Sequence, residues 1–191
     1  ITAATPALST VRADVFHSVV AKLLWVMKRS RPDIETAISF LCTRVSKSDE
    51  DDWAKLKRLL QFLSQTIDDV RVVAADDLSK LLTWVDASYA IHHDMRGHTG
   101  GAMSFGTGII QGKASKQKLN TKSSTETEVV GASDYLPYNM WMQNFMEAQG
   151  YTLSENVYHQ DNQSAMLMET DGRNSCMGNS RHIHIQYFFI K

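Results

Sequence analysis

Residues 118–135 are KLNTKSSTETEVVGASDY, and this stretch marks the change from a polar loop to a helix. The Ser/Thr cluster at 123–125 supplies typical N-cap side chains. Glu126 and Glu128 follow in the first turns, where free backbone N–H groups favour negative charge. The stretch therefore predicts a capped helix terminus. A chemical role for either glutamate requires acidic side chains from other parts of the chain that converge on it.

Length and composition limit the possible folds. A chain of 191 residues with 43% hydrophobic and 21% charged residues is typical of one medium folded domain, or of a small domain with a helical annex. The formal net charge of −1 gives no argument for a nucleic-acid partner, so only the local distribution of charge can support one. Cys42 and Cys176 lack the spacing of a metal site, and we expect free thiols in a reducing compartment.

The ends of the chain carry no targeting signal. No apolar run reaches membrane-spanning length, and the first residues lack the pattern of a signal peptide, so we expect no membrane partner. The chain begins without Met and stops within an apolar pattern at residues 187–191. We therefore expect a fragment of a longer protein, truncated at its C-terminus.

The N-terminal part contains three apolar stripes at helical spacing. They cover residues 11–27, 34–45 and 53–63, with Pro32 in a first turn and Ser48 as the expected N-cap of the third helix. Three helices with short connections predict a small helical bundle within residues 1–74. The basic side chains of this bundle suit either a nucleic-acid face or an ordinary solvated surface, and the pattern does not choose between them.

The pattern of residues 75–191 is different and predicts a mixed α/β domain. Three short strands with Gly-containing connections predict an antiparallel meander. The helix that follows should be kinked or divided at Pro137. The expected elements are strands at 80–86, 99–105, 109–115 and 157–161, and helices from 124 and at 162–169. Residues 180–191 suit a strand or a helix, and a helix is preferred because it sets His184 and Tyr187 on one side.

Three acidic side chains are expected to converge in this domain. Asp86 and Asp161 each lie at the end of a predicted strand, and the helix that begins near residue 124 can add Glu128 or Glu126. Clustered carboxylates repel one another unless cations bind them, and hard oxygen ligands suit Mg²⁺ or Mn²⁺. Two such ions can activate a water and stabilise a leaving oxygen. The spacing also allows three separate solvated acids.

Five ordered motifs give the chain a family resemblance. They are WVDAS (84–88), SKQKLN (115–120), KSSTETE (122–128), QDNQSA (160–165) and RHIHIQYFF (181–189). Together they resemble the ribonuclease H domain at the C-terminal end of copia-type retrotransposon polyproteins. The helical part agrees, because its segments FHSVVAKLL (16–24), RPDI (31–34) and WAKLKRLL (53–60) resemble the thumb or connection segment of the reverse transcriptase. The resemblance covers most of the chain.

The resemblance implies a ribonuclease H-like fold, with a five-stranded mixed sheet and flanking helices. It implies metal-dependent hydrolysis of the RNA strand of an RNA–DNA hybrid by two Mg²⁺ ions, for which Mn²⁺ is a possible substitute. It places the metal ligands and catalytic residues at Asp86, Glu128, Asp161 and His184. Glu128 is preferred to Glu126 because the family's glutamate precedes a hydrophobic pair, which matches Val129-Val130.

His184 departs from the family pattern, since many members carry Asp there. A neutral imidazole brings no negative charge and prefers softer ions than Mg²⁺. We therefore expect lower occupancy of the second metal site, weaker cleavage with Mg²⁺ and a preference for Mn²⁺. His182 lies next to the ligand position and suits a structural or substrate-side role equally well.

Substrate contacts follow from the same resemblance. Ser88, Asn162 and Gln163 flank the expected ligands and suit hydrogen bonds to the RNA strand. A local basic run suits phosphate contacts, although each of its lysines suits a solvated surface as well; the run is Lys113, Lys116, Lys118 and Lys122. His92 and His93 suggest a pair of metal ligands, but adjacent residues do not face one site together. We therefore expect them to lie in a mobile loop.

The family context implies partners and a location. The partners are the RNA–DNA hybrid and an upstream polymerase domain of the same polyprotein, and the location is intracellular, in cytoplasmic virus-like particles. Two alternatives remain open. One is a weak or inactive nuclease remnant that binds hybrid or duplex, and the other is a structural subdomain that positions template-primer for the polymerase.

Overall fold

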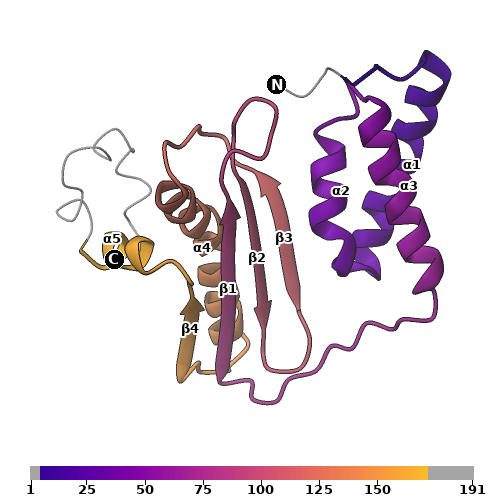
Figure 1. Cartoon of the computed structure of the whole chain (residues 1–191). Helices are drawn as coiled ribbons and strands as arrows, with labels where there is room; N and C mark the ends of the chain where they lie inside the picture. Colours follow the sequence, from indigo (N-terminus) through magenta and orange to yellow (C-terminus); the bar gives the residue numbers. More distant parts are fainter. Residues whose placement is uncertain (1–4, 172–191) are drawn as a thin grey trace. The chain divides into compact units, whose positions relative to one another are not determined.

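The computed structural model describes residues 5–171 of the chain. Contacts divide the chain into two compact units, Ile1–Arg71 and Val72–Lys191. The first contains helices and the second contains a sheet with helices (Figure 1). The predicted boundary at residue 74 falls in the segment between the last helix of the first unit and the first strand of the second.

The first unit has the three predicted helices and a short 3-10 turn. They are α1 (Thr10–Arg29), η1 (Pro32–Ile34), α2 (Glu35–Cys42) and α3 (Glu50–Gln65). Their apolar stripes form one core, because residues three and four apart lie on the same face of a helix. The buried core residues are Phe16, Val20, Leu23, Met27, Ile34, Ile38, Leu41, Leu56 and Leu59.

Helix α3 begins one residue later than predicted. Its N-cap is Asp49, whose carboxylate accepts a hydrogen bond from the Asp52 backbone N–H at 2.9 Å. The Asp52 carboxylate in turn accepts from the Asp49 backbone N–H at 3.2 Å, which completes a capping box. The prediction of Ser48 as the N-cap is therefore wrong, and Ser48 is buried beside the cap instead.

The second unit is a mixed four-stranded sheet in the described residues, with the order β3-β2-β1-β4. Strand β1 (Lys80–Ser88) pairs antiparallel with β2 (His98–Ser104), which pairs antiparallel with β3 (Gln111–Lys116). Strand β4 (Glu155–His159) pairs parallel with β1. The mixed α/β class and the antiparallel meander are confirmed. The fifth strand implied by the resemblance is not seen in residues 5–171.

One long helix, α4 (Ser124–Ala148), packs along the sheet (Figure 1). Tyr135 lies against the backbone of Gly101 so closely that a Cβ at Gly101 would be 2.2 Å from the tyrosine ring. Asn139 donates to Thr83 Oγ1 at 2.8 Å, and Tyr158 Oη donates to the Ala132 carbonyl at 2.9 Å. These contacts with β2, β1 and β4 hold α4 on the sheet.

Helix α4 is continuous through Pro137, so the helix is not split there, and the alternative of a kink at Pro137 stays a prediction. The buried neighbours Tyr135 and Asn139 hold the helix to the sheet on both sides of the proline. Helix α5 (Gln163–Asp171) follows β4 and ends the described part of the chain. Within residues 5–171, no helix combines the length and the apolar character that a membrane crossing requires.

Candidate metal centre

Strands β1 and β4 bring Asp86 and Asp161 to the same place. The two strands are parallel neighbours, so their carboxyl ends meet at one edge of the sheet. Asp86 lies within β1 and is exposed between the buried side chains Val85 and Ala87, as expected from the alternation of a strand. Strand β4 ends at His159, two residues earlier than predicted, so Asp161 lies just beyond the strand and not within it.

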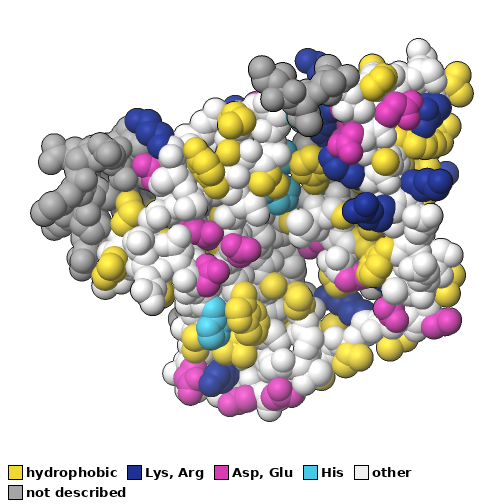
Figure 2. Space-filling view, in the orientation of Figure 1, with side chains coloured by type: hydrophobic (Ala, Val, Ile, Leu, Met, Phe, Trp, Pro, Cys, Tyr) yellow, Lys and Arg dark blue, Asp and Glu magenta, His cyan; other side chains and the backbone are white. Residues whose placement is uncertain are grey.

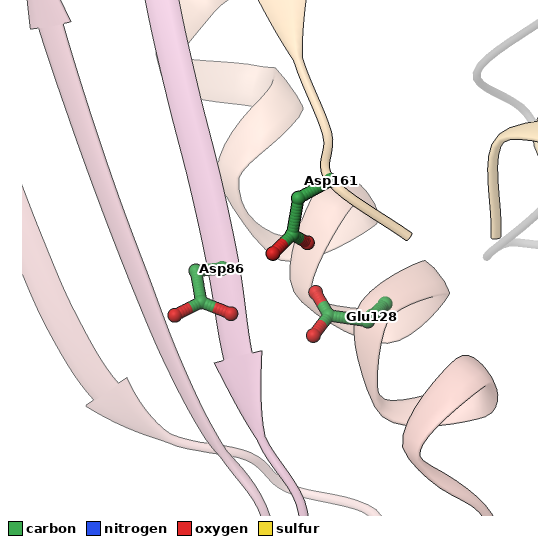
Figure 3. A group of neighbouring side chains, drawn as sticks. All are labelled: Asp86, Glu128 and Asp161. Atoms are coloured by element: carbon green, nitrogen blue, oxygen red, sulfur yellow. The ribbon is translucent and has the colours of Figure 1, made fainter. Parts of the chain in front are cut away.

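The start of helix α4 separates the two glutamates. Ser123 is the N-cap, and its Oγ accepts a hydrogen bond from the Glu126 backbone N–H at 3.2 Å. The Glu126 carboxylate accepts from the Lys122 backbone N–H at 2.7 Å, so Glu126 caps the helix as expected. Glu128 lies two residues farther along the helix and faces Asp86 and Asp161 (Figure 3).

The three carboxylates form one cluster. One oxygen from each of Asp86, Glu128 and Asp161 lies within 4.8 Å of the others. Asp86 and Asp161 are exposed, whereas Glu128 is only 6% exposed. The Glu128 Oε2 atom is buried and has no hydrogen-bond partner within the described part of the chain. A buried oxygen without a partner, next to two more carboxylates, fits the ligand set of a hard divalent cation.

The protonation of Glu128 follows from this environment. Burial raises the pKa of Glu128 to about 7, and the negative charges of Asp86 and Asp161 act in the same direction. A backbone hydrogen bond at Ala87 acts against this rise. Without a cation, Glu128 therefore holds a proton over much of the range below neutral pH.

Two of the expected substrate-contact residues have partners inside the protein. Lys116 forms an ion pair with Asp94, with Nζ and Oδ2 at 2.7 Å. Asn162 accepts a hydrogen bond from the Ala165 backbone N–H at 2.9 Å and so caps helix α5. Their contacts with nucleic acid stay predictions.

The other residues expected to contact the substrate have exposed side chains. Ser88, Lys118, Lys122 and Gln163 are all exposed. Ser88 lies two residues after Asp86 on β1 and therefore points to the same face of the sheet. His184, the predicted fourth ligand, lies outside the described residues, as does His182.

A buried histidine pair was not predicted from the sequence. His92 Nε2 and His98 Nδ1 are 3.0 Å apart, and both rings are at least nine-tenths buried. Burial lowers the pKa of His92 to about 4 and also lowers the pKa of His98, so both imidazoles are neutral near neutral pH. His92 was expected in a mobile loop. Nothing in the spacing of the two residues indicated that the loop folds back onto β2.

Comparison with curated proteins gives related polyproteins. The chain is 28% identical over 178 residues to the retrovirus-related Pol polyprotein from transposon TNT 1-94 of Nicotiana tabacum. The aligned residues make up 92% of this chain and 13% of that protein. The chain is 28% identical over 179 residues to the retrovirus-related Pol polyprotein from transposon RE2 of Arabidopsis thaliana, or 92% of this chain and 12% of that protein. The chain has homologues among retrovirus-related Pol polyproteins of plant transposons.

A further relative has a different kind of name. The chain is 27% identical over 128 residues to the secreted RxLR effector protein 161 of Plasmopara viticola, or 66% of this chain and 90% of that protein. No family model matches the chain. No solved structure matches it. The chain spans only about an eighth of the two Pol polyproteins, and these matches support a retrotransposon polyprotein context.

Proposed function

We propose that the sheet unit is the ribonuclease H domain of a copia-type retrotransposon polyprotein, with a ribonuclease H-like fold. In this proposal it hydrolyses the RNA strand of an RNA–DNA hybrid. The observation that carries the proposal is the cluster of Asp86, Glu128 and Asp161, whose oxygens lie within 4.8 Å of one another. The similarity to Pol polyproteins gives this cluster a context in which such hybrids are made.

The three carboxylates would hold two Mg²⁺ ions, or Mn²⁺ in their place. Bound cations supply Lewis-acid activation of the attacking water and stabilisation of the leaving oxygen. The exposed Asp86 and Asp161 would hold the ions without a large desolvation cost of their own. The buried Glu128 would have to give up its proton to act as a ligand, and a nearby positive charge would lower the pKa that burial raises.

Substrate contacts in this proposal come from the open side chains near the cluster. Ser88 shares a face of β1 with Asp86, and Gln163 lies at the start of α5, close in sequence to Asp161. Lys118 and Lys122 contact phosphates, so binding should weaken as salt rises. The helical unit is the thumb or connection segment that joins this domain to an upstream polymerase. The proposed location is a cytoplasmic virus-like particle.

A cleavage assay tests the proposal. A hybrid with a labelled RNA strand is incubated with the chain over a series of Mg²⁺ and Mn²⁺ concentrations. Cleavage of the RNA strand, but not of the DNA strand or of an RNA duplex, is the expected result. Asp86→Asn should abolish it, and Asp77→Asn, which changes an exposed turn acid, should not. Binding of hybrid without cleavage in either metal would instead favour a structural subdomain or an inactive remnant.

A further inference from the structure

The side chain of Gln160 has no role in the site described so far. Gln160 directly follows the last residue of β4, His159, and directly precedes Asp161. Successive side chains of an extended chain point to opposite sides, so Gln160 belongs on the side of Tyr158, two residues before it. That side of β4 is the one on which α4 packs, because Tyr158 Oη donates to the Ala132 carbonyl at 2.9 Å.

The contact between Tyr158 and Ala132 also sets which residues lie next to each other farther along. Gln160 is two residues after Tyr158 on the strand side, a distance of about 7 Å. Glu128 is four residues before Ala132 on α4, a rise of about 6 Å. The two steps lead to the same place, so Gln160 lies level with Glu128. In agreement with this placement, the Gln160 side chain acts as a hydrogen-bonding neighbour that lowers the pKa of Glu128 against the effect of burial.

The amide of Gln160 is held in one orientation. Its Oε1 accepts a hydrogen bond from the Asn162 backbone N–H at 3.1 Å, and this bond closes a turn around Asp161. The Asn162 side chain in turn accepts from the Ala165 backbone N–H at 2.9 Å, which anchors the turn to the start of α5. An amide has its acceptor at one end and its donor at the other, so this bond leaves the Nε2 end of Gln160 free to point away from the turn.

A donor and an acceptor are therefore left over beside each other. Gln160 Nε2 is buried and has no hydrogen-bond partner in residues 5–171, and the same is true of Glu128 Oε2. Buried polar atoms without partners are uncommon in folded proteins, and each one calls for a physical reason. Here the donor belongs to a neutral amide, and the acceptor belongs to a carboxylate of the candidate metal centre.

We propose that Gln160 is a positioning residue of the metal centre, whose Nε2–H donates to the Glu128 carboxylate when a cation is bound there. This inference rests on the proposed function, through its metal centre. The hydrogen bond occupies one lone pair of the carboxylate and fixes the direction in which the remaining lone pairs face the ion, as outer hydrogen bonds do for metal ligands in general. The same amide holds the turn around Asp161, so one side chain orients two of the three ligands.

A neutral donor suits this position better than a charged one. Figure 2 shows a group of acidic side chains at the surface of the sheet unit, with no Lys or Arg side chain among them. A basic side chain in place of Gln160 would pair with Glu128 and compete with the cation, and an acidic one would add a fourth repelling charge. The amide orients the carboxylate and leaves the negative charge of the cluster available to the ion.

Calorimetric titration of Mn²⁺ into the intact chain tests this role without any nucleic acid. Gln160→Met keeps the length of the side chain and removes its donor and acceptor. At about pH 8 it should weaken Mn²⁺ binding by about tenfold. Gln61→Met is the matched control, since it makes the same change at an exposed position of α3 and should leave the affinity unchanged. Thermal unfolding in a chelator shows whether each variant is folded.

A double variant shows whether Gln160 acts through Glu128. If it does, Gln160→Met should have almost no further effect on Mn²⁺ affinity in a chain that already carries Glu128→Gln. A loss of affinity that arises only from a disturbed turn at Asp161 would be as large in the double variant as in the single one. The comparison therefore separates a positioning residue from a merely structural one.

Nuclear magnetic resonance observes the proposed hydrogen bond without a variant at position 160. In a ¹⁵N-labelled chain, the side-chain amide signal of Gln160 is assigned through its bonded carbons. Saturating Mg²⁺ should shift one of its proton signals downfield, because a hydrogen bond to a carboxylate forms. The same addition to Glu128→Gln should leave this signal in place.

The outcomes distinguish this inference from the proposed nuclease. Weaker Mn²⁺ binding in Gln160→Met, together with the Mg²⁺-dependent shift, supports the positioning role even if the chain never cleaves a hybrid, and then the nuclease alone is contradicted. Equal Mn²⁺ affinity in Gln160→Met and the wild-type chain would overturn the positioning role, as would an equal loss of affinity with and without Glu128→Gln. Absence of Mn²⁺ binding to the wild-type chain would overturn it together with the metal centre.

Discussion

Two buried acids, one in each unit, show how the two halves of the molecule differ. Asp52 of the helical unit is 1% exposed and Glu128 of the sheet unit is 6% exposed, and both lie near the start of a helix. Asp52 is bonded to Arg44 Nε at 2.9 Å and to the Asp49 backbone. Glu128 has two further carboxylates near it and one oxygen without a partner in the described residues. The bonded carboxylate of Asp52 fits a structural role, whereas the partnerless oxygen of Glu128 beside two more carboxylates fits a ligand site.

The largest expected effect comes from neutralising each of these acids. Glu128→Gln should reduce hybrid cleavage by more than about 100-fold, because it removes a metal ligand. In metal-free buffer above neutral pH it should stabilise the protein by about 1–3 kcal/mol, since it relieves burial and repulsion of a carboxylate. Asp52→Asn should instead destabilise the protein by about 3 kcal/mol, because Arg44 loses a buried partner.

Urea denaturation with a chelator measures both changes in stability, and the hybrid assay measures both activities. The two variants should show opposite signs in stability. If Glu128→Gln destabilised the protein as much as Asp52→Asn does, the distinction between the two acids would fail.

The second effect concerns how α4 is held on the sheet. Gly101→Ala should destabilise the sheet unit by about 1–3 kcal/mol, because its Cβ overlaps the Tyr135 ring and α4 must move. Gly100→Ala is the matched control, since the added Cβ makes only an ordinary contact at 3.8 Å. Thermal unfolding compares the two. Equal losses of stability would show that the contact between Tyr135 and Gly101 does not fix the helix.

The smallest effect is a difference in pH dependence. The hydrogen bond from Arg31 lowers the pKa of Asp33 below its usual 3.8, so the stability that Asp33 contributes is present above that pH and lost as the pH falls further. Burial raises the pKa of Glu128 from 4.5 to about 7, so its contribution is full below 4.5 and lost as the pH rises to about 7.

Matched variants isolate these contributions. In a chelator, the stability gained by Glu128→Gln should grow between about pH 5 and about pH 8, and the stability lost by Asp33→Asn should shrink as the pH falls below about 4. Denaturation curves recorded at several pH values provide the test. A gain from Glu128→Gln that is constant over the whole range would mean that Glu128 does not titrate where its burial indicates.

Much of the fold was predictable because periodicity reflects burial. The helical stripes of the first unit and the alternating strand β1 each have one apolar face, and the structure buries those faces. The convergence of Asp86 and Asp161 followed from one assumption, that their strands are parallel neighbours. The position of Glu128 relative to Glu126 depended on the family pattern, since both glutamates suit a helix start.

The errors have particular causes. Ser48 and Asp49 are both good N-caps, and the choice is made by Asp52, which returns a hydrogen bond only to Asp49. Pro137 does not divide α4, because tertiary contacts on both sides of the proline outweigh the lost hydrogen bond. The pair of His92 and His98 depends on a loop that folds back over β2, and no local pattern encodes such a return.

The most direct test of the account is calorimetric titration of Mn²⁺ into the intact chain. We predict binding at about pH 8 that weakens toward pH 6 as Glu128 takes up its proton, with proton release that can be measured in buffers of different ionisation enthalpy. Asp86→Asn and Glu128→Gln should each weaken binding by about tenfold or more, and Asp52→Asn should leave it unchanged. Mn²⁺ binding that is absent in the wild-type chain, or equal in the wild-type chain and Asp86→Asn, would contradict the assignment of these carboxylates as a metal centre.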